Sequence, residues 1–202
     1  MKVLVVGGTG LIGGAVVAAL EDAGHDVVSA GHARGEFRVD LARAASIEAL
    51  YEAVGSLDAV VCTAGIAAFG TLEELDDDRW ASSIANKFMG QVNLVRLGLS
   101  HVREGGSFTL TTGTLAQRPT PGTAAVAAVG GAVESIARAA ALDLAGRHRV
   151  NVVSPGWVAE SRQAMGLDPM PGIWAKDLAA SYVRLVQGDE TGCVVEAERS
   201  ES

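Results

Sequence analysis

The stretch "VVGGTGLIGGAVVAAL" (residues 5–20) joins a short valine run to a helical pattern through a glycine turn. Gly7, Gly10 and Gly13 recur with the spacing G-x-x-G-x-x-G. We interpret Gly7 as the tight turn, Gly10 as the place where backbone approaches a pyrophosphate, and Gly13 as a close helix–strand contact. A helix N-terminus offers free N–H groups to phosphates. The turn therefore predicts a dinucleotide site, whose other phosphate-facing residues are Thr9, Leu11 and Ile12.

Outside this stretch, short apolar runs alternate with longer helical patterns. The expected strands are Lys2–Val6, Asp26–Ala30, Ala59–Cys62, Ser107–Thr111, Arg149–Val153 and Cys193–Glu196. The expected helices lie near 11–23, 46–54, 76–102, 123–145 and 175–187. Repeated strand–helix–strand units predict one α/β domain, a Rossmann-like doubly wound parallel sheet of about seven strands covered by helices on both faces. We expect this domain to span 1–196, followed by a flexible tail, 197–202.

Composition excludes several function classes. A net charge of −8 and a pI near 5.0 argue against nucleic-acid binding, which needs clustered Lys and Arg. The two cysteines, Cys62 and Cys193, lie in apolar runs whose spacing fits neither a disulfide framework nor a metal site. Five glycines interrupt the uncharged run 3–20, so we expect a buried strand, turn and helix instead of a membrane span. We expect a cytoplasmic protein that binds a small molecule, with no metal and no membrane.

The end of the second strand bears on the choice of cofactor. An NAD-binding fold places an acid there to bind the ribose hydroxyls. Here the positions read Ala30, Gly31 and His32, with Arg34 close behind. No carboxylate would repel a 2′-phosphate, and His32 and Arg34 would bind one. We therefore expect NADP(H) to be favoured over NAD(H), the alternative being that both are solvated loop residues.

Five further motifs, in order, resemble the short-chain dehydrogenase/reductase family over nearly the whole chain. They are "RVDL" (38–41), "CTAG" (62–65), "IANKFMGQVNL" (84–94), "GGSFTLTTG" (105–113) and "RVNVVSPGWV" (149–158). The resemblance implies that Asn86 is the active-site asparagine. It implies cofactor contacts from Asp40, Leu41, Ala64, Gly65, Thr111, Pro155, Gly156 and Val158.

The family's proton-transfer residues are absent. Aligning "AVESIARAAALDL" (132–144) with the family's helix places Val126 in the tyrosine position and Gly130 in the lysine position. The serine position falls on Thr112 or Gly113. We expect a divergent short subgroup in which Asn86, Lys87 and Thr112 are the catalytic candidates. The other substitutes considered for the missing acid are Thr111, Thr114 and Arg118.

Three functions fit these residues. The first is an NADP(H)-dependent oxidoreductase of a carbonyl, alcohol or activated-alkene substrate with an atypical active site. The second is a redox-silent NADP(H)-binding protein, and the third is a non-redox enzyme that reuses the cleft. In the resembled family the two long helices pair with their copies, so we also expect a homodimer or homotetramer formed through 76–102 and 123–145.

Overall fold

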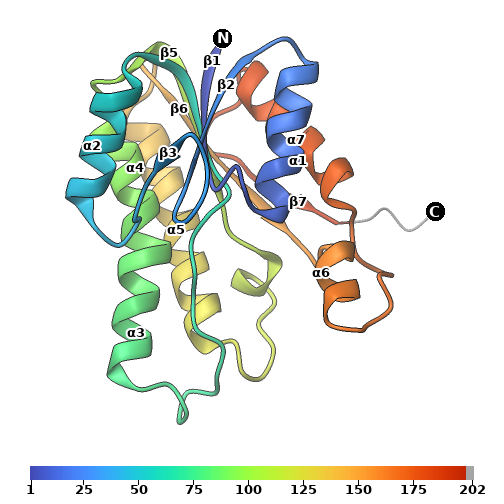
Figure 1. The fold of residues 1–202 in the computed structure, drawn as a ribbon. Coiled ribbons are helices and arrows are strands. Elements are labelled where there is room, and N and C mark those ends of the chain that lie inside the picture. Colours follow the sequence, from blue (N-terminus) through green and yellow to red (C-terminus); the bar gives the residue numbers. More distant parts are fainter. Residues whose placement is uncertain (199–202) are drawn as a thin grey trace.

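The computed structural model describes residues 1–198, which form one seven-stranded sheet (Figure 1). The strand order is β3-β2-β1-β4-β5-β6-β7, and every neighbouring pair is parallel. The strands are β1 (Lys2–Val6), β2 (Asp26–Gly31), β3 (Phe37–Arg38), β4 (Leu57–Cys62), β5 (Val102–Thr111), β6 (Arg149–Pro155) and β7 (Val194–Ala197). The doubly wound parallel sheet expected from the sequence is confirmed.

The central strand β1 decides where a ligand binds. It pairs with β2 through Lys2–Val6 and with β4 through Val3–Val6. After β1 the chain adds β2 and β3 on one side of β1, and it then crosses to place β4 on the other side of β1. In open α/β sheets ligands bind outside the carboxyl ends of the strands at such a reversal. The turn after Val6 lies at that position.

Helices cover both faces of the sheet, as Figure 1 shows. On one face lie α1 (Leu11–Asp22) and α7 (Ala175–Gln187). On the other lie α2 (Ala44–Val54), α4 (Gly90–Gly98) and α5 (Ala124–Asp143). The short α6 (Ala159–Ala164) stands apart from the layers, beyond the end of β6. Burial on two faces explains why the strands read as continuous apolar runs.

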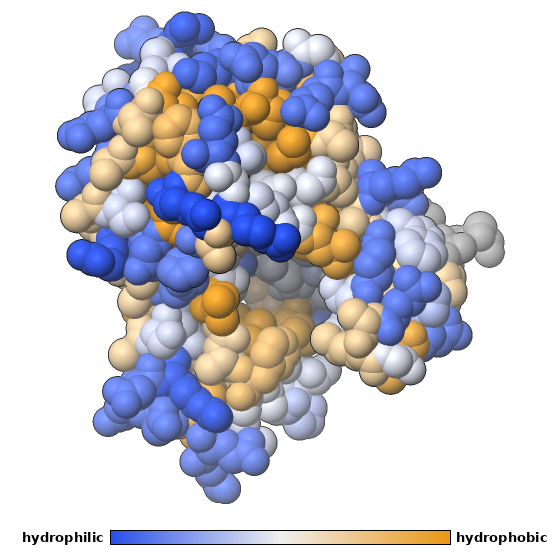
Figure 2. All heavy atoms as spheres, viewed as in Figure 1, coloured by the Kyte–Doolittle hydropathy of each residue, from blue (hydrophilic) through white to orange (hydrophobic). Residues whose placement is uncertain are grey.

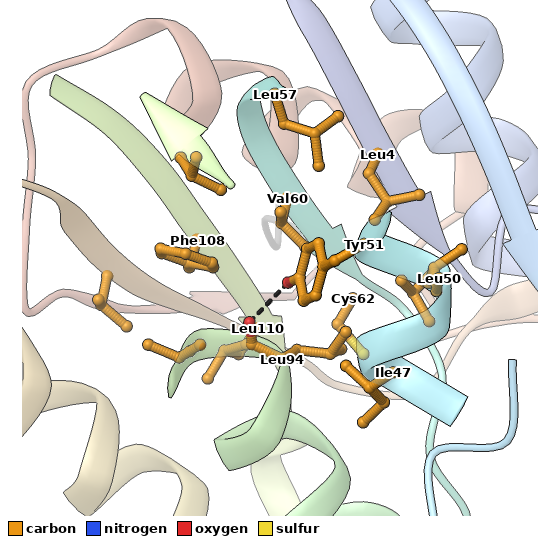
Figure 3. Packing of buried hydrophobic residues seen from close by; sticks show 14 of the residues in the cluster. Leu4, Ile47, Leu50, Tyr51, Leu57, Val60, Cys62, Leu94, Phe108 and Leu110 are labelled. Carbon is orange, nitrogen blue, oxygen red and sulfur yellow. Dashed lines mark hydrogen bonds between the residues drawn. The ribbon is translucent and has the colours of Figure 1, made fainter. Parts of the chain in front are cut away.

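Figure 3 shows how the α2 face is packed. Tyr51 of α2 is fully buried against Leu4, Val60 and Phe108 of the sheet. Its hydroxyl donates to the carbonyl of Leu94 in α4 at 2.6 Å. A buried phenol needs such a partner, so this bond fixes α2 against α4 beneath the sheet.

The helix expected over 76–102 is interrupted. It consists of α3 (Asp77–Ser83), a π-helical turn (Ile84–Met89) and α4. Asp76 caps α3, since its side chain accepts from the Arg79 N–H at 2.9 Å. π-Turns occur frequently at functional sites. This one carries Asn86 and Lys87, two of the catalytic candidates.

Several expected boundaries change in the structure. The two-residue β3 was not among the expected strands because it is too short to give a pattern. β5 begins at Val102, ahead of the expected Ser107, and β7 ends at Ala197, which the sequence assigned to the tail. Glu198 pairs with Arg118, and the remaining tail residues, 199–202, lie outside the described residues.

The structure also resolves the apolar run at the N-terminus. Residues 3–20 form β1, the glycine turn and most of α1, as expected. By length and composition alone α5 is apolar enough to cross a membrane. Its Ala125, Val133 and Ala137 are buried inside the domain. A helix in the core of a globular domain can have this same length and apolar composition.

Candidate functional site

The glycine turn is held in place by backbone contacts. Gly7 has φ +92° and donates its N–H to the carbonyl of Ala30 at 2.7 Å. A Cβ on Gly7 would lie 2.7 Å from Oγ1 of Thr63, and a Cβ on Gly13 would lie 2.0 Å from the carbonyl oxygen of Gly7. Neither position admits a side chain. Gly10 is the N-cap of α1 and has no side-chain cap, so the first N–H groups of that helix are free to bind an anion.

A cleft of about 360 Å³ opens at this turn. Figure 2 shows the surface hollowed at the carboxyl edge of the sheet, beside the segment that carries α6. Its volume is within the range of small-molecule sites. Among the expected site residues it is lined by Gly7, Thr9, Gly10, His32, Leu41, Ala64, Gly65 and Asn86. The set comes from the segments that follow β1, β2, β3 and β4 and from the π-turn.

Other expected cofactor residues lie outside this lining. Gly13 is buried beneath the turn and Leu11 is exposed beside it. Arg34 is exposed in the same turn as His32. The Asp40 carboxylate accepts from the N–H of Ala42 at 3.0 Å, within the turn before α2. The remaining residues outside the lining are Ile12, Thr111, Pro155, Gly156 and Val158.

Three of those residues have structural partners of their own. The Thr111 hydroxyl is buried, where it donates to the carbonyl of Cys62 at 2.6 Å and lies 2.8 Å from the Tyr182 hydroxyl. It is therefore part of the core, and its expected contact with a cofactor does not arise from that hydroxyl. Gly156 donates to the carbonyl of Ala197, and Val158 begins α6.

The π-turn directs Asn86 and Lys87 inward. Oδ1 of Asn86 accepts from the N–H of Ile66 at 2.8 Å and so holds the loop after β4. The Lys87 side chain is partly buried, and its Cδ lies 2.6 Å from where a Cβ of Gly65 would stand. Burial lowers the pKa of Lys87. Among residues 1–198 its ammonium has no hydrogen bond or ion pair, so it remains available to a ligand.

The Lys87 ammonium lies close to a second ionisable group. The Cys62 thiol is fully buried at the end of β4, and burial raises its pKa to about 11 while the nearby Lys87 charge opposes that rise. The thiol is neutral at physiological pH and donates to the carbonyl of Ala64 at 3.5 Å. Cys62 is therefore a core residue beneath the site and not a nucleophile.

The family's lysine position is closed. A Cβ on Gly130 would lie 3.0 Å from Cβ of Ala116, in the 3₁₀ turn Thr114–Ala116 that follows β5. The turn lies close to α5 at this position, so a side chain on Gly130 would crowd Ala116. Around Gly131 there is nothing within 4 Å of a Cβ. The two glycines have different surroundings.

A buried polar network, missed at the sequence level, lies one helical turn beyond Gly130. Glu134 of α5 is 5% exposed, and its Oε1 accepts from Oγ1 of Thr112 at 3.0 Å and from Nε2 of Gln117. Oε1 of Gln117 accepts weakly from the Ser154 hydroxyl, at 3.5 Å. One signal could have revealed it. Val126, Gly130 and Glu134 are four residues apart, so Glu134 shares the face of the tyrosine and lysine positions.

A family model described as Enoyl-(Acyl carrier protein) reductase matches residues 11–192. Among curated proteins, 2-(S)-hydroxypropyl-CoM dehydrogenase 3 of Xanthobacter autotrophicus is 33% identical over 153 residues, 71% of this chain and 60% of that protein. The Inactive 2-(S)-hydroxypropyl-CoM dehydrogenase 2 of the same organism is also 33% identical, covering 69% of this chain and 64% of its own length. The chain thus spans less than two thirds of these relatives.

Solved structures match over the full length. The protein lin1944 from Listeria innocua has a TM-score of 0.93 at 36% identity, covering 98% of this chain and 99% of that one. A small-chain dehydrogenase in complex with NADPH has a TM-score of 0.86 at 28% identity, covering 98% of this chain and 96% of that one. With the family model matched from α1 almost to β7, this chain belongs to the short-chain dehydrogenase/reductase family, whose members bind nicotinamide cofactors.

Proposed function

We propose that this protein is an NADP(H)-dependent oxidoreductase with an atypical active site, acting on a small carbonyl, alcohol or activated-alkene substrate. The observation that carries the proposal is the glycine cradle, in which Gly7 and Gly13 admit no side chain and α1 presents uncapped N–H groups to the cleft. That cradle fits a pyrophosphate, so the residues present suit a dinucleotide. When bound, the cofactor supplies or accepts a hydride at its nicotinamide ring.

NADP(H) is the proposed form because no carboxylate follows β2. His32 lines the cleft and Arg34 is exposed two residues away, so both lie at the turn where a 2′-phosphate would be placed. The solved relative that holds NADPH supports the same choice. A cation at this turn would favour the phosphorylated ribose through a charge-assisted hydrogen bond.

Three side chains are proposed for the chemistry. Asn86 lines the cleft, and the Lys87 side chain lies against Gly65, another lining residue. From there the free Lys87 ammonium would bind the ribose or a developing oxyanion. Thr112 follows β5 directly, at the same carboxyl edge of the sheet. If no side chain replaces the missing tyrosine, reduction of an activated C=C bond would fit somewhat better than carbonyl reduction, because solvent can protonate a carbanion.

Cofactor binding is the first test. NADPH fluorescence should rise on titration with the protein, and NADH should bind more weakly. Replacing Arg34 by Glu should weaken NADPH binding about 10- to 100-fold, since a charged hydrogen bond is worth ~1.5–3 kcal/mol, and reverse the preference. The control is Arg147→Glu, which makes the same charge change in the turn before β6, at the amino ends of the strands. Absence of binding by either nucleotide would disprove the proposal.

Turnover is the second test. A panel of ketones, enals and quinones, followed by the loss of NADPH absorbance, separates an enzyme from a redox-silent nucleotide-binding protein. The silent alternative has a specific observation in its favour, since Val126 and Gly130 replace the family's proton-transfer pair. Binding of NADPH without turnover of any panel member would favour that alternative.

We also propose that the protein assembles as a homodimer or homotetramer through α4 and α5. An apolar groove of about 180 Å³ runs between these helices, and its lining includes Val92, Leu99 and Ile136. Light scattering should give a multiple of the 20.7 kDa chain mass. Ile136→Arg should reduce that mass, whereas Leu72→Arg, an equally apolar exposed position in the loop after β4, should not.

A further inference from the structure

The carboxylate of Glu134 is the most unusual charge in the part of the chain that the structure describes. It is 5% exposed on the sheet side of α5, yet no Lys, Arg or His among residues 1–198 forms an ion pair with it. Burying an unpaired charge is costly. Its Oε1 has two donors, Thr112 and Gln117. A helix rich in Ala, Val and Gly thus keeps one buried ionisable group beside the end of β5.

The direction of one hydrogen bond gives this carboxylate a chemical role. The Thr112 hydroxyl has a single hydrogen, which it donates to Glu134 Oε1 at 3.0 Å. Its oxygen therefore presents only lone pairs to any other group. Thr112 is partly exposed, and its N–H donates to the carbonyl of Val153, so it lies between the carboxyl ends of β5 and β6. A substrate hydroxyl at that edge would meet an acceptor backed by a carboxylate.

We propose that Thr112 and Glu134 form a proton relay that replaces the family's missing tyrosine, with Thr112 touching the substrate oxygen and Glu134 acting through it. In the oxidation direction, a bound oxidised nicotinamide would accept the hydride of the alcohol C–H bond. The alcohol O–H proton moves to Thr112 Oγ1 as the proton of Thr112 moves to Glu134 Oε1. The products are a carbonyl compound, the reduced cofactor and a Glu134 carboxylic acid. Reduction reverses each transfer.

The relay commits the protein to a substrate class. It handles a proton on oxygen, so the substrate is a carbonyl/alcohol pair, because reduction of a C=C bond would leave the proton to solvent. Gln117 donates to the same carboxylate oxygen as Thr112 and is itself linked to Ser154 of β6. Both oxygens of the relay thereby have fixed positions between β5, α5 and β6, which is what a positioned general base requires.

The test uses variants that keep shape and remove the proton. Glu134→Gln keeps an acceptor oxygen but takes up no proton, and Thr112→Val removes the hydroxyl at nearly constant volume. Each should lower kcat about 100-fold on the first ketone of the panel that wild type reduces. KM and NADPH affinity should stay within about threefold. The double variant should be no slower than either single one, because the two residues act as a unit.

Three further measurements separate this role from a structural one. Glu134→Asp should restore part of the lost kcat, and Glu48→Gln, an exposed carboxylate of α2, should change nothing. In infrared spectra of the NADPH-free protein, the carboxylate band that Glu134→Gln removes should shift in Thr112→Val. An unshifted band would show that Thr112 does not donate to Glu134, and would overturn the relay without any assay of turnover.

The relay rests on the proposed oxidoreductase function, and the outcomes keep the two apart. If wild type reduces no ketone in the panel, the relay fails, and it fails together with the redox proposal if enals and quinones are also inert. If wild type reduces a ketone and both single variants keep its kcat, only the relay fails. If Glu134→Gln does not fold, Thr112→Val still tests the relay, because it removes only a hydroxyl at nearly constant side-chain volume.

Discussion

The two halves of the sheet are built from different contacts at the carboxyl ends of their strands. In the β1–β4 half, backbone approaches backbone, with Gly7, Gly13 and Gly31 each leaving no room for a Cβ. In the β5–β6 half, side chains meet instead, and Thr112, Gln117 and Glu134 form a hydrogen-bonded network. The first half keeps the features by which the family binds its cofactor. In the second half, Val126 and Gly130 stand where the family's tyrosine and lysine are expected, and the Glu134 carboxylate lies nearby.

This difference teaches that binding and chemistry are constrained separately in one sheet. A glycine cradle depends on where atoms are absent, so any added side chain damages it. A proton-transfer site depends on which donors are present, so one constellation can replace another provided the geometry holds. The following predictions test each side of the comparison.

The largest effect should come from the cradle. Gly13→Ala places a Cβ 2.0 Å from the Gly7 carbonyl oxygen, so the helix must move away from the strand. We expect a loss of about 3 kcal/mol in unfolding free energy and loss of NADPH binding. Urea denaturation and fluorescence titration measure both.

The neighbouring glycine is the matched control for that variant. At Gly14 the nearest atom to an added Cβ is 3.8 Å away. Gly14→Ala should therefore keep NADPH binding and raise stability by up to about 1 kcal/mol through helix propensity. Equal effects of the two alanines would show that the close contact of Gly13 with Gly7 does not control NADPH binding or stability.

The second effect concerns the buried Cys62 thiol of β4, whose ionisation lowers the free energy of unfolding at high pH. Burial raises the pKa of Cys62 from 9.0 to about 11. The stabilisation is complete below the unfolded value and is lost as pH rises through the folded value. We expect unfolding free energy to fall by about 3 kcal/mol between pH 9 and pH 11. Burial also raises the pKa of Tyr51 and Tyr182, which extends the decline to higher pH.

Denaturation series at several pH values measure this decline. Cys62→Ala should flatten its first part, whereas Cys193→Ala, at the partly exposed thiol, should leave it unchanged. A decline that survives in Cys62→Ala would place the ionising group elsewhere.

The smallest effect belongs to the glycine pair of α5. Gly131→Ala should stabilise the protein by up to about 1 kcal/mol, because nothing lies within 4 Å of the new Cβ. Gly130→Ala should gain less, since its Cβ would meet Ala116 at 3.0 Å. Thermal denaturation gives the order. A destabilising Gly131→Ala would show that a second copy of α5 packs closely at that position.

The sequence predicted the β1–β4 half well because glycines and strand periodicity leave local patterns. Gly7 and Gly10 line the cleft, and the turn that they form follows from near neighbours in the chain. The β5–β6 half could not be predicted in the same way. The Thr112–Glu134 bond joins residues 22 apart, and helix periodicity gives only the face on which Glu134 lies.

Asn86 and Lys87 illustrate a second limit. Counted along a regular α-helix, they lie about 100° apart, on different faces. The π-turn breaks that count, and both side chains are directed inward. Nothing in "IANKFMG" (84–90) marks the change in helix type, because π-turns depend on the contacts around the helix.

The π-turn has a consequence for how functions are transferred between relatives. Its hydrogen bonds reach one residue farther than those of an α-helix, so it accommodates one extra residue while α3 and α4 keep their directions. Numbering that follows the helix before Ile84 is therefore out of phase with the helix after Met89. In a sequence alignment of this segment to a relative with a regular helix, residues on one side of the π-turn are matched to residues that occupy different positions in space. Roles within the segment have to be assigned by superposition, residue by residue.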